Sequence, residues 1–313
     1  MASTLARPSQ LLTLAPRALT PLALVATVLA LLAPSRGLAG RSDLLLALLV
    51  LATAMGIPAS ELAGLRRHAG TVALLSVAPL VVLGAVAWAL GRPFSPPTQD
   101  GLLAVGLASS EVASVGLVAL AGADATIAIG IVTGSLVVSA LLGPVAIGLL
   151  AGASHHGGTG HLLARFALVV IVPLAAGVAV RTLVPRLERV DSEREGVAAL
   201  AVAALVYAAL SGAHGARGLG SALIASLLFL AVSAGLGEVW RRRPGPAAVP
   251  GALTIAMRDF AVAAALASQA FGGRAGTVPG VYGVVMLLGG ATAAWALGRQ
   301  RAQTSARAGP GER

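Results

Sequence analysis

Long apolar runs separated by short polar stretches fill almost the whole chain. A helix that spans the apolar layer of a membrane needs about 20 mostly apolar residues. By this measure the pattern predicts ten spanning helices, at residues 18–38, 43–57, 70–91, 101–122, 125–152, 162–184, 197–213, 219–240, 251–271 and 277–298. We therefore expect an all-α integral membrane protein with a short polar tail over residues 299–313.

The first apolar segment has a second interpretation. Arg7 and Arg17 precede its apolar core, as in a secretory signal peptide. However, no convincing small-residue cleavage site comes before position 43, and the internal repeat described below needs this segment. A spanning helix is therefore the favoured interpretation.

Composition supports a membrane protein and excludes several function classes. Of the 313 residues, 57% are hydrophobic and 11% are charged, whereas soluble domains carry about 25% charged residues. The absence of Cys excludes disulfides and thiolate-bound metals. Despite the net charge of +10, aromatic residues make up only 3%, too few to stack nucleic-acid bases. No nucleotide-binding, nucleophile-elbow or metalloprotease motif occurs, so we expect neither an enzyme nor a cofactor.

The distribution of Arg predicts the topology. All 22 basic residues are Arg. Fifteen of them fall at the termini or in loops on one side of a ten-helix chain, and six fall on the other side. Because basic residues concentrate on the cytoplasmic side, both termini are predicted to be cytoplasmic. Arg241 to Arg243 belong to that side and could contact anionic lipid. The abundance of Ala, Gly and Arg suggests a bacterial source, and for a bacterial multi-pass helical protein we expect the inner membrane.

Two parts of the chain look like copies of each other. Residues 101–136 and 251–286 each hold a helix with a charged centre, a run of small residues, a Gly-containing break and another helix. The pattern divides the chain into repeats over residues 1–153 and 154–298. Five helices per repeat is an odd number, so the two copies insert in opposite orientations. Inverted repeats with a midplane binding site are typical of secondary transporters.

Three ionisable residues lie deep inside predicted helices: Glu111, Arg258 and Asp259. A charge at the membrane centre costs about 2.5–3.5 kcal/mol or more, so such residues usually pair or take part in function. Two carboxylates and one guanidinium leave one negative charge that a proton, a cation or another basic residue must neutralise. We predict that Arg258 contacts Glu111 or an anionic substrate, while Glu111 or Asp259 carries the coupling cation. A purely structural ion pair is the alternative.

Neighbouring polar residues complete the predicted site. Spacings of four and three residues place Thr254, Arg258 and Gln269 on one face of a continuous helix. The predicted substrate- and ion-binding residues are Ser110, Glu111, Ser114, Thr254, Arg258, Asp259 and Gln269. No metal site is expected, since His155, His156 and His161 lie in a Gly-rich loop where solvated side chains are the rule. Gly130 and Gly134 are assigned to helix packing.

Several stretches resemble the bile acid:sodium symporter family. They are MGIPASELAGLRRHAG at 55–70, ASVGLVALAGADATIAIGIVTGSLVVSALLGP at 113–144 and VIVPLAAGVAVRTLVP at 170–185. The resemblance implies ten helices in two inverted repeats, divided into a panel and a core, with helices four and nine broken and crossing at the midplane. It also implies an organic anion as substrate and sodium as the coupling ion.

The sequence departs from the family pattern at the sodium sites. The family's Ser-Asn in helix four and Glu-x-Gly-x-Gln-Asn in helix nine correspond here to Ser114, Val115, Thr254, Ala256, Arg258 and Asp259. A guanidinium offers only donors and a positive charge, so Arg258 cannot bind sodium but could take the place of the cation. We therefore expect a secondary transporter of a small organic anion, with Na⁺ or H⁺ as the coupling ion.

Two alternatives stay open. A cation/proton antiporter with similarly crossed helices would need only the carboxylates. A non-transporting membrane sensor or scaffold would use the buried charges for stability alone. Electroneutral exchange of sodium for protons would identify the first. The second predicts that substitution of Glu111, Arg258 and Asp259 affects only stability.

Overall fold

The computed structural model describes residues 21–35, 37, 41–57, 64–151, 158–184, 191–211, 216–290 and 292. This part of the chain is helical and contains no strand. The helices are Pro21–Leu32, α3 (Ser42–Ala54), the short 3-10 helix η1 (Leu65–His68), α5 (Ala69–Gly91), α6 (Pro96–Leu107), α7 (Ala113–Leu120), α8 (Ala125–Leu150), α9 (Thr159–Leu183), α10 (Asp191–Ser211), α11 (Ala216–Arg241), α12 (Ala248–Ala256), α13 (Phe260–Phe271) and Thr277–Gly290.

The length and exposure of these helices show a multi-pass membrane protein. Each of the ten predicted segments contains helix. Five stretches are long and apolar enough to cross a membrane by length and composition: Leu65–Gly91, Ala125–Leu150, Thr159–Leu183, Arg194–Ser211 and Gly218–Arg241. Large apolar side chains such as Leu32, Leu149 and Leu183 remain more than three-quarters exposed. Such exposed apolar surface suits contact with lipid tails rather than with water.

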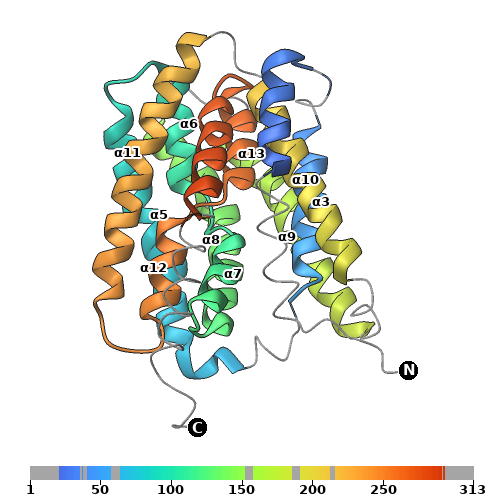
Figure 1. Ribbon diagram of the computed structural model, residues 1–313, viewed down its shortest axis with the longest axis vertical. Coiled ribbons are helices and arrows are strands. Elements are labelled where there is room, and N and C mark those ends of the chain that lie inside the picture. Colours follow the sequence, from blue (N-terminus) through green and yellow to red (C-terminus); the bar gives the residue numbers. More distant parts are fainter. Residues whose placement is uncertain are drawn as a thin grey trace, which may run out of the picture.

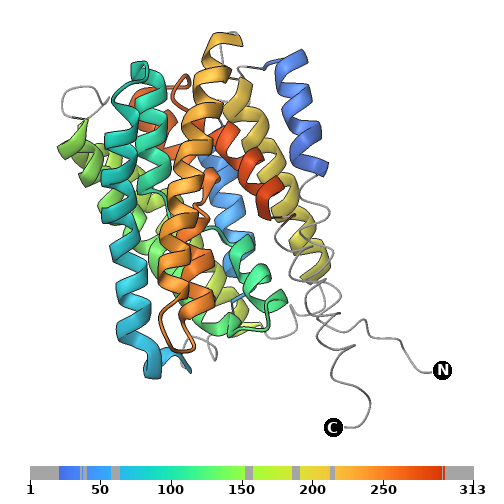
Figure 2. The ribbon, with the colours of Figure 1, turned by 60° about the vertical axis from the view of Figure 1, so that its left-hand side comes forward.

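The helices form two packed groups, which lie side by side in Figure 1 and overlap in the turned view of Figure 2. The small group consists of α3, α9 and α10, with α3 packed on both others and α9 packed also on α8. The large group consists of α5, α6, α7, α8, α11, α12 and α13, in which α5 packs on α6 and α8, and α11 packs on α12. The first helix, Pro21–Leu32, joins the small group through the hydroxyl of Tyr207, which donates to the carbonyl of Ala33 just beyond it.

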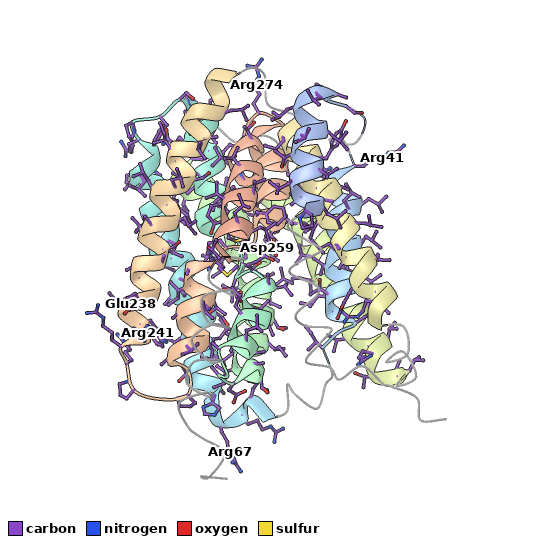
Figure 3. The ribbon with its side chains drawn as sticks, in the orientation of Figure 1. Arg41, Arg67, Glu238, Arg241, Asp259 and Arg274 are labelled. Atoms are coloured by element: carbon purple, nitrogen blue, oxygen red, sulfur yellow. The ribbon has the colours of Figure 1, made fainter. Side chains whose placement is uncertain are left out.

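Charged residues mark two opposite ends of the molecule (Figure 3). Arg41 and Arg274 lie at one end, Arg67 and Arg241 lie towards the other, and Asp259 lies between them. This separation agrees with the two sets of loops that the Arg distribution distinguishes. We refer to these as the Arg274 end and the Arg241 end.

Two of the predicted helices are interrupted in the middle. Residues 108–112 separate α6 from α7, and residues 257–259 separate α12 from α13. The backbone is extended at Ala108 (ψ 165°) and at Met257 (φ −111°, ψ 117°). The prediction that Thr254, Arg258 and Gln269 share one face of a continuous helix is therefore wrong, because helical periodicity stops before the second break and restarts after it.

Small residues allow α8 to approach its neighbours closely. A Cβ atom on Gly130 would lie 2.5 Å from the side chain of Leu65, and one on Gly134 would lie 2.4 Å from the hydroxyl of Ser76. Both glycines therefore serve helix packing, as the small-residue spacing predicts.

Candidate substrate site at the crossing of two broken helices

The two helix breaks pair with each other. They form a short antiparallel bridge in which the N–H of Glu111 donates to the carbonyl of Met257 at 3.0 Å, and the N–H of Asp259 donates to the carbonyl of Ser109 at 2.8 Å. A broken helix frees backbone groups that must find partners away from water. Here each break supplies a hydrogen-bond acceptor for a backbone N–H group of the other, so the polar backbone of both breaks is held at one place inside the protein.

Hydroxyl groups of α8 support the break between α6 and α7. Ser139 donates to the carbonyl of Leu107 at 2.7 Å, where α6 ends. One turn earlier, the hydroxyl of Ser135 accepts the N–H of Ser110 at 3.0 Å. The spacing of four residues puts both serines on the same face of α8, so one helix face supplies both contacts.

Hydroxyl groups from two other helices support the break between α12 and α13. Ser233 of α11 donates to the carbonyl of Ala256 at 3.1 Å. The hydroxyl of Tyr282, in the helix Thr277–Gly290, accepts the N–H of Arg258 at 3.0 Å. The ring of Tyr282 packs edge-on against Phe229 with centroids 5.9 Å apart. These contacts fix the backbone from which the two charged side chains of this break extend.

Asp259 has a structural role in addition to its charge. Its Oδ1 accepts the N–H groups of Ala261 and Val262 at 2.9 and 3.0 Å, so it is the N-cap of α13. A negative charge is stabilised at this position by the helix dipole as well as by the two hydrogen bonds. The carboxylate is therefore held at the crossing by the helix that it begins.

Arg258 is almost completely buried, with 1% of its surface exposed. Its Nη2 donates to the carbonyl of Ala108, and its Nε has no partner. The ion pairs in the described part of the chain do not include Arg258. The expected pairing with Glu111 is therefore not formed, because the guanidinium turns towards the backbone of the other break.

Buried polar atoms without a hydrogen-bond partner gather at the crossing. They are Oγ of Ser109, Oγ of Ser110, Oε2 of Glu111 and Nε of Arg258. Buried polar groups in native proteins nearly always have a partner, so such a cluster needs an explanation. Carboxylate and hydroxyl oxygens suit a cation or a proton, while a guanidinium nitrogen suits an anion. The crossing thus holds groups for both.

The sequence comparison identifies the family. A family model described as the sodium bile acid symporter family matches residues 43–215, more than half of the chain. The chain belongs to this family. The comparison with curated proteins found no match. The family is one of transporters, so membership agrees with the multi-pass helical fold.

The family match covers only one of the two breaks. Residues 43–215 run from α3 to just beyond α10 and include Glu111 in the first break. Arg258 and Asp259, in the second break, lie outside the matched region. The properties of the second break in this member of the family therefore rest on its own geometry.

The structure brings five of the seven predicted site residues together. Ser110, Glu111, Arg258 and Asp259 lie in the two breaks, and the hydroxyl of Ser114 donates to the carbonyl of Glu111 at 2.6 Å. The side chain of Glu111 accepts the N–H of Ala113 through Oε1 at 3.5 Å and is 8% exposed as a residue.

The other two predicted residues have different contacts. The hydroxyl of Thr254 donates within α12 to the carbonyls of Pro250 and Gly251, at 2.9 and 3.1 Å. Gln269 lies near the far end of α13, and its Nε2 donates to Oδ1 of Asp43 in α3 at 2.7 Å. Gln269 therefore belongs to a contact between the two helix groups rather than to the crossing.

A hollow near the Arg274 end lies apart from the crossing. The hollow near the Arg274 end has a volume of about 260 Å³ and is lined by Pro96, Asp100, Phe271 and Arg274 among others, with no residue of the breaks. The charged residues of the crossing, Glu111, Arg258 and Asp259, are buried in this conformation. His155 and His156 lie outside the residues that the structure describes. Among the described residues, no group of three or more His, Asp or Glu side chains could hold a metal ion.

Proposed function

We propose that the protein is a secondary active transporter of a small organic anion, which binds at the crossing of the two broken helices. The observation that carries this proposal is the buried guanidinium of Arg258, which lies in no ion pair of the described residues although the two paired breaks also hold two buried carboxylates. An intramembrane charge kept at such cost is explained best by a ligand that it binds.

The proposed architecture is ten spanning helices in two inverted repeats of five. The repeats cover residues 1–153 and 154–298 and are followed by a polar tail over 299–313. The order of elements supports this division. The series α6, break, α7, turn at Gly122 and α8 has the same form as α12, break, α13, turn at Gly272 and the helix Thr277–Gly290, and both turn glycines have positive φ. The antiparallel pairing of the two breaks agrees with opposite insertion.

The proposed location is the bacterial inner membrane, with both termini and the Arg241 end in the cytoplasm. The excess of Arg in one set of loops supports this orientation. Arg67 and Arg241, both from that set, lie towards the same end of the molecule (Figure 3).

Charge balance explains why anion binding and cation uptake would be coupled. With both carboxylates ionised, Glu111, Arg258 and Asp259 sum to one negative charge, which repels an anion in a region of low dielectric constant. When each carboxylate carries a proton or a cation, only the positive charge of the Arg258 guanidinium remains, and the site attracts an anion. Each ligand then raises the affinity for the other, which is the thermodynamic basis of symport.

A second candidate is a cation/proton antiporter. It is favoured by the two buried carboxylates that form no ion pair with Arg258, and by the hydroxyls of Ser109 and Ser110 that lack partners. Such a protein would exchange sodium for protons with no effect of organic anions.

The proposed function is tested by ligand-induced stability of the purified protein. A ligand that binds the folded state stabilises it with the logarithm of its concentration. The unfolding temperature is measured in sodium, potassium and choline salts at several pH values, with and without a bile acid or a short-chain carboxylate. We expect stabilisation by the anion that grows as the pH falls, and loss of this effect in Arg258→Met.

Matched variants separate the two candidates. Glu111→Gln and Asp259→Asn remove one carboxylate each at the crossing, whereas Glu238→Gln removes one at the exposed end of α11, where it pairs with Arg241. A sodium-specific stabilisation that only the crossing variants lose would identify sodium as the coupling ion. Sodium/proton exchange in proteoliposomes without any anion effect would refute anion transport and establish the antiporter.

A further inference from the structure

One carboxylate joins the two helix groups near the Arg274 end. Asp43 lies in the first turn of α3, in the small group. Its Oδ1 accepts a hydrogen bond from Nε2 of Gln269, in α13 of the large group, at 2.7 Å. Its Oδ2 pairs with Arg165 of α9, in the small group, at 2.6 Å from Nη2 and 2.8 Å from Nε. The bond between Asp43 and Gln269 is thus a polar contact that crosses from one group to the other.

The two halves of the crossing pack differently on the small group. The outer half-helix α13 packs on α3, α9 and α10, whereas α7 packs on α8 and α12 of its own group. Within the described residues, α7 has no comparable packing on the small group. A Cβ atom on Gly116 of α7 would meet nothing within 4 Å. Figure 1 shows α13 in the upper half of the molecule and α7 in the lower half. The groups are therefore in contact near the Arg274 end and less so near the Arg241 end.

The contact between α13 and the small group is formed mostly by small side chains, with Leu205 of α10 as the large exception. Ser42 of α3, Ala208 of α10, and Ala264 and Ser268 of α13 surround a remaining space of about 20 Å³. Small side chains bury little apolar area and interlock little, so this interface resists separation weakly. The two groups also meet where α9 packs on α8, but along the α13 interface the charge-assisted hydrogen bond at its edge is the strong directional contact.

We propose that the hydrogen bond between Asp43 and Gln269 is a latch that keeps the two helix groups closed at the Arg274 end. It breaks when the crossing becomes accessible from that end. The proposal rests on the proposed transport function, which requires the crossing to be reached from each side of the membrane in turn. Arg165 moves with Asp43 because both belong to the small group, so the carboxylate keeps a partner when the latch opens.

Single cysteines can report on the latch because the chain contains no Cys. Ala208→Cys places a thiol in the small space beside the latch, and Gly116→Cys places one on the open side of α7. Each reporter is labelled in membrane vesicles with a membrane-impermeant maleimide, applied from either side. In the latched protein, we expect slow labelling at position 208 and fast labelling at position 116.

Gln269→Leu removes the latch and is expected to change both rates in opposite directions. A hydrogen bond to a charged group corresponds to a shift of about tenfold in a two-state equilibrium. We therefore expect labelling at position 208 to become about tenfold faster and labelling at position 116 to become slower. The matched control is Gln99→Leu, the same substitution in α6, at a residue packed on Gly91 within the large group. It should leave both rates unchanged.

The labelling rates, read together with anion transport, test the latch separately from the transport function. Unchanged rates in Gln269→Leu, or a rise at both reporters that indicates general loosening, would overturn the latch. Should Gln269→Leu fail to fold, Gln269→Asn shortens the side chain by one methylene and carries the same expectation. Labelling needs no substrate, so opposite shifts without any anion transport would support the latch and count against the transport function. Anion transport together with unchanged labelling would refute the latch and leave the function intact.

Discussion

Tyr282→Phe isolates the cost of one hydrogen bond at the crossing. The substitution removes a single oxygen atom and leaves the ring in its edge contact with Phe229. That oxygen accepts the N–H of Arg258 at 3.0 Å, and both residues are at most 1% exposed. A buried N–H that loses its partner costs about 1–3 kcal/mol. We therefore expect the free energy of unfolding to fall by that amount, with no change in the shape of the core.

The measurement is equilibrium unfolding of the purified protein in detergent, followed by circular dichroism. Tyr207→Phe is a matched control, because it removes the chain's other tyrosine hydroxyl, which donates to the carbonyl of Ala33 from an exposed position. We expect this control to cost less than about 0.5 kcal/mol, as substitutions at exposed positions usually do. Equal stability of Tyr282→Phe and the natural protein would show that Arg258 finds another acceptor, and the assigned role of Tyr282 would be wrong.

Three further substitutions test the crossing and its surroundings. Asp259→Ala removes the N-cap of α13 and should cost about 0.5–2 kcal/mol of stability, whereas Asp259→Asn keeps the cap and should cost less; equal losses would contradict the cap. Gly106→Ala would place a Cβ atom 2.5 Å from the carbonyl of Leu83 and should cost about 1–3 kcal/mol, while Gly116→Ala meets open space and should be neutral or slightly stabilising. Glu111→Gln keeps one carboxyl position neutral, so stabilisation by an organic anion should persist to higher pH, which a thermal-shift titration would detect.

The apolar runs predict much of the fold, because a helix that crosses a membrane needs about 20 mostly apolar residues. Every predicted segment contains helix, and Pro79, Pro144 and Pro173 lie inside helices without ending them. Neighbouring helices in a membrane protein compensate for the lost hydrogen bonds, so proline is a weak signal for a helix end here. Conversely, residues 108–112 and 257–259 contain neither proline nor glycine, yet both interrupt a helix.

The charged residues of the site are visible in the sequence, but their partners are not. Glu111, Arg258 and Asp259 stand out because the segments around them are apolar. Two features of the sequence point to the breaks. Each break contains consecutive polar residues, and Asp is a residue that often begins a helix. The sequence does not single out the supporting hydroxyl groups of Ser135, Ser139, Ser233 and Tyr282, since single hydroxyl residues are common in membrane helices.

The contact between Asp43 and Gln269 shows where such prediction ends. The two residues are 226 positions apart. Each has an ordinary local setting, one in the first turn of α3 and the other near the end of α13. Only the packing of the two helix groups brings them together. A spacing rule within one helix assigned Gln269 to the charged site because it treated an interrupted helix as continuous.

Asp259 is both the N-cap of α13 and a carboxylate that could take up a proton or a cation. Uptake at this carboxylate therefore affects how well the first turn of α13 is ordered. Its Oδ1 accepts hydrogen bonds from two N–H groups in the first turn of α13, those of Ala261 and Val262. A protonated carboxyl is a weaker acceptor than a carboxylate, and a bound cation draws on the same oxygen atoms. Arrival of either therefore loosens the first turn of α13, and departure tightens it again. The rate at which these two amide hydrogens exchange with deuterium therefore reports whether Asp259 carries a proton or a cation. This rate can be measured without knowing which anion is transported.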